Sequence, residues 1–136
     1  MHIKNHFLIL LFLAPLSLFA QKVERGLSYL DKNEKQYIQW LIDIGQIISP
    51  SGQEQERAEA VAAIMREIGL QEVRVNEMPN AIGIIPGKSN KSIVFISTMD
   101  VLAGVAEHQR KAEGPPYYAG GRIIGPGTNT SSTSVS

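Results

Sequence analysis

The apolar residues between Gln36 and Ile48 recur at the spacing of one helix face. These positions are Tyr37, Trp40, Leu41, Ile44, Ile47 and Ile48. Pro50 ends the pattern, because the residue before a proline is pushed out of the helical region. The pattern therefore predicts a helix over residues 36–48.

A second helix is predicted to follow directly. Ser51 and Glu54 have the spacing of a capping box, in which the serine hydroxyl and the glutamate side chain satisfy backbone N–H groups at a helix start. The helix should run to about Ile68, and Gly69 can supply the left-handed residue that ends it. Its apolar face consists of Ala58, Val61, Ala62, Met65 and Ile68.

After Gly69 the apolar pattern becomes strand-like. Val73 and Val75 alternate with polar residues, which indicates a half-exposed strand. A turn over 76–80 leads to a second predicted strand over 81–85. The run Ile93–Ile96 is continuously β-branched or aromatic, which is typical of a strand buried on both faces of a parallel sheet. These helices and strands predict an α/β layer fold.

The remainder of the chain has a weaker pattern. Residues 101–121 are polar and contain Gly and Pro, so a loop is expected there. A short extended piece is predicted over 121–124. Gly125-Pro126-Gly127 then predicts a tight turn, because glycine tolerates positive φ and proline fixes its own φ.

The first 20 residues are predicted to be a signal peptide. Lys4 precedes an almost unbroken apolar run from Phe7 to Leu18, and Ala20 is a small residue before a cut at Gln21. The alternative is a buried N-terminal helix. Cleavage would export residues 21–136 to a periplasm or out of the cell, with no membrane anchor left in the mature chain.

Charge and cysteine content narrow the possible partners. Residues 1–20 contain one of the 13 basic residues and none of the 13 acidic ones, which leaves the mature chain a net charge of −1. This balance gives no electrostatic case for binding nucleic acid or an anionic membrane. The chain has no Cys, so it cannot form disulfides in an oxidising compartment.

Three motifs together resemble a family of co-catalytic zinc exopeptidases. They are Ser49-Pro50-Ser51-Gly52-Gln53-Glu54, Ser97-Thr98-Met99-Asp100 and Gly125-Pro126-Gly127-Thr128-Asn129-Thr130. The family contains aminoacylases, carboxypeptidase G, succinyl-diaminopimelate desuccinylase and tripeptide aminopeptidases (metallopeptidase family 20). The resemblance covers about residues 36–135. It implies the N-terminal part of a truncated three-layer domain with a mainly parallel or mixed sheet. Related zinc aminopeptidase families share the opening of the pattern.

The resemblance also implies which residues should bind metal, and the chain departs from the family at these positions. Thr98 stands where the family has a ligand His, and Thr130 stands where it has an Asp that bridges two metal ions. Asp100 matches the Asp that orients the ligand His; the alternative is an Asp that caps a turn. A neutral hydroxyl is a poor zinc ligand. No zinc or other cofactor is therefore expected for this chain, although the family uses zinc.

The resemblance implies a secreted protein whose family reaction is zinc-dependent hydrolysis of peptide or N-acyl amino acid amide bonds. This chain is expected to be inactive, because both ligand positions are threonines and the remaining family ligands would lie beyond residue 136. Two alternatives stay open. One is a non-catalytic protein whose cleft still binds small peptides or N-acyl amino acids. The other is a fragment of an active hydrolase.

Other residues offer little further chemistry. His108 is the only His of residues 21–136, and the neighbouring Glu107 and Glu113 do not form a regular ligand spacing around it. The Ser/Thr-rich end is not preceded by a nucleophile elbow. No Gly-rich phosphate-binding loop is present.

Overall fold

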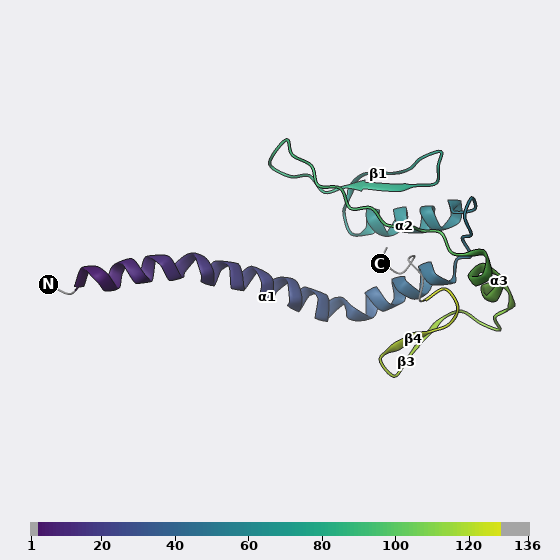
Figure 1. Ribbon diagram of the computed structural model, residues 1–136, viewed down its shortest axis with the longest axis horizontal. Helices are drawn as coiled ribbons and strands as arrows, with labels where there is room; N and C mark the ends of the chain where they lie inside the picture. Colours follow the sequence, from purple (N-terminus) through teal and green to yellow (C-terminus); the bar gives the residue numbers. More distant parts are fainter. Residues whose placement is uncertain (1–2, 129–136) are drawn as a thin grey trace. The chain divides into compact units, whose positions relative to one another are not determined.

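The computed structural model describes the backbone of residues 3–128 and the side chains of residues 23–128. It combines three helices with two small antiparallel sheets, which is an α/β structure in the general sense (Figure 1). The elements are α1 (Ile3–Gln46), α2 (Gln55–Glu67), β1 (Gln71–Val75), β2 (Ala81–Ile84), α3 (Ala103–Lys111), β3 (Tyr117–Ala119) and β4 (Arg122–Ile124).

The chain divides into two compact units, one up to Gln36 and one from Tyr37 onward. Helix α1 continues through the first unit and ends at Gln46, so the helix predicted over 36–48 is the last part of a longer one. In the described part of the chain, no helix is long and apolar enough to span a membrane. The core of the second unit consists of Ile44, Ala58, Val61, Ala62, Val101 and Ala106.

Helix α2 confirms the second predicted helix, with its bounds inside the predicted range. Ala58, Val61 and Ala62 are buried on its inner face, whereas Ile68 is exposed. Gly69 has a φ of 85°, and its N–H donates to the carbonyl of Arg66 at 3.0 Å. The left-handed glycine therefore ends α2 as predicted.

Strands β1 and β2 form an antiparallel pair with Val75 opposite Ala81. The predicted turn between them is held by the side chain of Asn76, whose Oδ1 accepts from the N–H of Met78 at 3.1 Å and of Asn80 at 2.9 Å. A Cβ added at Gly83 would lie 2.8 Å from Cδ2 of Leu70. Glycine at this position lets β2 approach the end of α2 closely.

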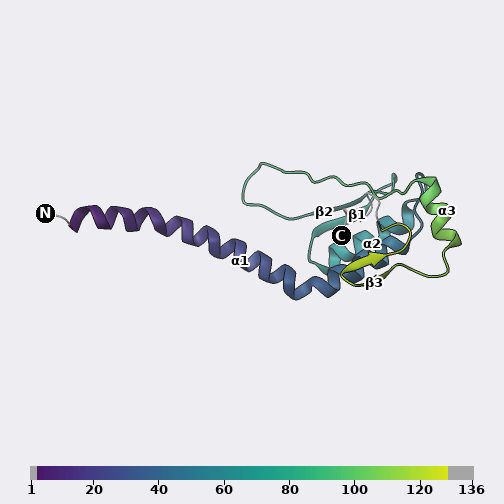
Figure 2. The same cartoon turned by 60° about the horizontal axis from the view of Figure 1, so that its bottom comes forward.

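The prediction of a buried strand over Ile93–Ile96 is wrong. The structure forms no strand there, and the four side chains are 85%, 75%, 94% and 90% exposed, from Ile93 to Ile96. Figure 2 shows the chain between β2 and α3 as a long open segment without regular structure. A continuous apolar run becomes a buried strand only where neighbouring strands and covering helices are available. Residues 3–128 supply none here.

The expected mainly parallel or mixed sheet is not formed by the described residues. Both sheets have two antiparallel strands, and the parallel pairing found in residues 3–128 is an isolated bridge between Pro50 and Val101. The three-layer arrangement implied by the resemblance is not formed by these two sheets.

The prediction of a loop over 101–121 is wrong in two places. Residues 103–111 form α3, and Tyr117–Ala119 pairs with β4 as an antiparallel hairpin. The helix was missed because Ala106 is its one buried residue, so its apolar face is too narrow to mark a helical period. The hairpin turn at Gly120 and Gly121 has φ values of 57° and 75°, as tight two-residue hairpin turns require.

Candidate functional site

The segment around Asp100 is bound to the turn between α1 and α2. The N–H of Val101 donates to the carbonyl of Ser49 at 2.8 Å, and Val101 is only 1% exposed. The hydroxyl of Ser49, itself fully buried, donates to the carbonyl of Met99 at 3.4 Å. These contacts bring together two motifs that lie about 50 residues apart in the sequence.

Arg57 completes this arrangement from the first turn of α2. Its side chain is fully buried, its Nη1 donates to the carbonyl of Met99 at 2.7 Å, and its Nη2 donates to the carbonyl of Ile47. The Nε atom has no partner among the described residues. One guanidinium therefore connects the end of α1 to the Asp100 segment. We call Ser49, Arg57 and Met99–Val101 the arginine clamp.

Burial lowers the pKa of Arg57 from its ordinary value, and the negative charge of Asp100 partly opposes this effect. An arginine remains protonated in proteins even when its pKa falls. The clamp therefore encloses a positive charge that two backbone carbonyls solvate and that a nearby carboxylate stabilises. A charge held in this way has a structural role, since its donors are directed at main-chain oxygens.

Asp100 is hydrogen-bonded to the upstream motif. Its Oδ2 accepts from the hydroxyl of Ser51 at 2.6 Å. The predicted capping box is therefore wrong: Ser51 donates to Asp100, and Oε1 of Glu54 accepts from the N–H of Gly52 at 2.7 Å. Helix α2 begins after Glu54 without a side-chain cap. The Asp100 carboxylate thus connects its own segment to the turn that precedes α2.

The predicted ligand positions are not assembled into a described metal site. Thr98 is exposed and follows the irregular segment instead of ending a strand. Thr130 lies outside the described residues. Among the described side chains of residues 23–128, no cluster of three or more His, Cys, Asp or Glu residues is placed to hold a metal ion. Asp100 accepts a hydrogen bond from the Ser51 hydroxyl and interacts electrostatically with the positive charge of Arg57, and both suit a carboxylate and not a cation site.

The third motif packs on the end of α1. A Cβ added at Gly127, which has a φ of 89°, would lie 2.9 Å from the carbonyl oxygen of Gly45 and 2.5 Å from Nε2 of Gln109. Gln109 donates to the same Gly45 carbonyl at 2.7 Å. The hydroxyl of Thr128 donates to the carbonyl of Gly125 at 2.7 Å. The predicted tight turn thus closes on the core of the second unit.

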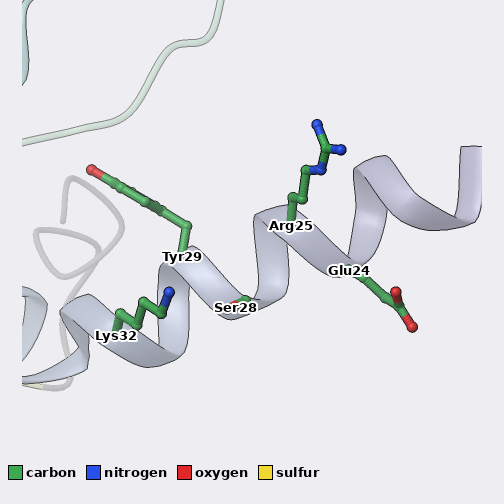
Figure 3. A pocket seen from close by; sticks show the side chains of 5 residues that line it. All are labelled: Glu24, Arg25, Ser28, Tyr29 and Lys32. Atoms are coloured by element: carbon green, nitrogen blue, oxygen red, sulfur yellow. The ribbon is translucent and has the colours of Figure 1, made fainter. Parts of the chain in front are cut away.

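The remaining candidates lie on exposed helix surfaces. His108 is exposed on α3, and Glu107 beside it forms an ion pair with Lys111 at 2.6 Å. A shallow pocket is lined by Glu24, Arg25, Ser28, Tyr29 and Lys32. Figure 3 shows that all five project from α1, with Glu24 directed away from Arg25 and Tyr29. Because its lining comes from one helix, no second element within residues 23–128 closes this pocket.

Sequence reasoning did not identify Ser49 and Arg57 as important residues. A signal for Arg57 was present, because it precedes Ala58 and lies one helical turn before Val61 on the buried side of α2. A charged residue at the edge of an apolar stripe needs a partner if it is buried. Ser49 gave no comparable signal. No family of known proteins, curated protein or solved structure matches the chain.

Proposed function

We propose that the chain is an exported protein that resembles zinc exopeptidases in its motifs and does not hydrolyse amide bonds. The observation that carries the proposal is the 2.6 Å hydrogen bond from Ser51 to Asp100. The resemblance implies that the strand-end Asp orients an imidazole ligand. In this chain the carboxylate is engaged by a serine of the upstream motif.

The chemistry of the neighbouring residues supports the same conclusion. Thr98 offers a neutral hydroxyl where zinc prefers nitrogen, sulfur or carboxylate oxygen. The main-chain carbonyl of Met99 is occupied by Arg57 and Ser49. We therefore propose that the motifs that resemble the family connect two parts of the fold. The hydroxyl of Ser51 and the guanidinium of Arg57 bind the Met99–Asp100 segment, and no metal ion is needed there.

Calorimetric titration with Zn²⁺ tests the metal part of the proposal. The chain should show no stoichiometric binding at sub-micromolar affinity, because catalytic zinc sites need three protein ligands. Incubation with N-acetyl amino acids and dipeptides in the presence of Zn²⁺ should release no free amino acid above the buffer rate. A tight isotherm or metal-dependent turnover would contradict the proposal. Binding of these compounds without turnover would favour the peptide-binding alternative.

A gain-of-function variant tests the assignment of the two threonines. In a longer chain that continues past Ser136 and supplies the remaining family ligands, Thr98→His combined with Thr130→Asp should raise zinc affinity, whereas each single change should do little, because ligands of one site act together. Ser92→His with Thr130→Asp introduces the same residue types away from the proposed position and is the matched control. Equal zinc affinity in both double variants would show that Thr98 does not occupy a ligand position.

A further inference from the structure

We propose that Ile93–Ile96 is an interaction surface on which a second copy of this chain pairs as an antiparallel β-strand. The side chains of this segment are between 75% and 94% exposed. Four consecutive large apolar residues in water are unusual, and contiguous exposed apolar surface of this kind marks sites of association.

The backbone of the segment is also available. Ile93–Ile96 makes no hydrogen bond to any other described residue, and neither small sheet includes it. Its β-branched and aromatic residues favour the extended conformation. The stretch Ser92–Ser97 contains no charged residue, Pro or Gly, which is the composition of segments that pair with copies of themselves. The arginine clamp holds the chain just after this segment, so one end of the surface is fixed.

The segment suits a second copy because both strands can use the same edge. In a pair of strands the side chains alternate between the two faces, so pairing joins the backbones and brings cross-strand side chains into contact. A two-fold pair leaves neither copy with an unpaired segment, because both copies contribute the same surface to the interface.

Charge selects the antiparallel orientation. Lys88 and Lys91 precede the apolar run, and Asp100 follows it. Antiparallel pairing brings the lysine end of one copy beside the aspartate end of the other, whereas parallel pairing would place lysines side by side. A two-fold pair centred on Phe95 sets that ring opposite its counterpart and sets Val94 opposite Ile96. Aromatic and aliphatic cross-strand pairs of this type are favourable.

Sedimentation equilibrium of the full chain over a range of concentrations tests the pairing. The chain should show a monomer–dimer equilibrium, and Phe95→Lys should raise the dimer dissociation constant by at least about 100-fold, since it places two like charges in an apolar interface. Met78→Lys is the matched control, because Met78 is 77% exposed on the turn between β1 and β2. It should leave the constant unchanged.

Disulfide trapping tests the orientation in a chain that has no Cys of its own. Phe95→Cys should form a cross-linked dimer on mild oxidation, because directly opposed Cα atoms lie within disulfide range. Lys91→Cys should not, because the two copies of this position would be roughly 26 Å apart. The proposal is overturned by a chain that stays monomeric, by equal effects of the two lysine substitutions, by cross-linking through Lys91→Cys, or by a monomer that pairs only with an added foreign peptide.

Discussion

The arginine clamp and the segment Ile93–Ile96 are neighbours in the chain, and they reverse the usual relation between polarity and burial. Ser49 and Arg57 are fully buried, whereas Phe95 is 94% exposed. The polar side chains are buried because each has partners: Arg57 and Ser49 both donate to the carbonyl of Met99. The apolar run is exposed because no element of the described residues covers it.

The difference shows what burial requires in each case. A polar group can be buried when hydrogen bonds replace its contacts with water. An apolar group needs a surface to pack against, and sequence composition alone does not supply one. The hydrogen bonds of the clamp come from residues of one compact unit. The proposed partner for Ile93–Ile96 is a second copy of the chain.

The largest effect is expected from removing the guanidinium of the clamp. Arg57→Met should destabilise the fold by roughly 3 kcal/mol, because the buried carbonyls of Met99 and Ile47 lose their donors. Arg66→Met is the control on the same helix, since Arg66 is exposed and makes only a 3.5 Å hydrogen bond to Val73. Urea denaturation measures both. Similar losses in the two variants would mean that the clamp does not hold the unit together.

A smaller effect on the unfolding free energy should distinguish two valines that differ mainly in burial. Val101 is 1% exposed and Val94 is 75% exposed. Val101→Ala should cost about 1–2 kcal/mol of unfolding free energy through the cavity that it leaves. Val94→Ala should change stability by less than about 0.5 kcal/mol at concentrations where the chain is monomeric. Equal costs would indicate that Ile93–Ile96 is packed in the free monomer.

The smallest effect is expected at Ser51, which lies outside the arginine clamp and donates a hydrogen bond to its Asp100. Ser51→Ala removes the hydrogen bond to Asp100 and should cost about 0.5–1 kcal/mol, because a solvent-exposed carboxylate can exchange its partner for water. Ser92→Ala, at another exposed serine, should cost nothing measurable in denaturation. A loss as large as that of Arg57→Met would mean that Asp100, and not Arg57, carries the connection.

Helix α2 and the strands β1 and β2 were predictable from the local sequence, whereas α3, β3 and the tertiary contacts were not. The end of α2 at Gly69 and the turn at Asn76 depend on neighbouring residues, so their signals are local. The burial of Arg57 depends on carbonyls that lie 10 and 42 residues away, which no periodic pattern reveals. Ser51 illustrates the same limit. It has the spacing of a capping box, but its hydroxyl donates to the carboxylate of Asp100, which is distant in the sequence.

The apolar run was predicted wrongly for a different reason. Ile93–Ile96 has the composition of a buried parallel strand, and composition describes what a segment can become when neighbours exist. The site prediction was limited in the same way. The resemblance assigned Asp100 to the position that orients a ligand His, with a turn cap as the alternative, and only the structure identified Ser51 as its partner.

Amide hydrogen exchange tests the contrast between the two regions most directly. It should be measured by NMR in the Phe95→Lys variant, which is not expected to pair with itself. The amide of Val101 donates to Ser49 in a buried position and should exchange at least about 100-fold more slowly than an open amide. The amides of Val94 and Ile96 should exchange at the rate of an unstructured chain. Equal protection of Val94, Ile96 and Val101 would contradict the account.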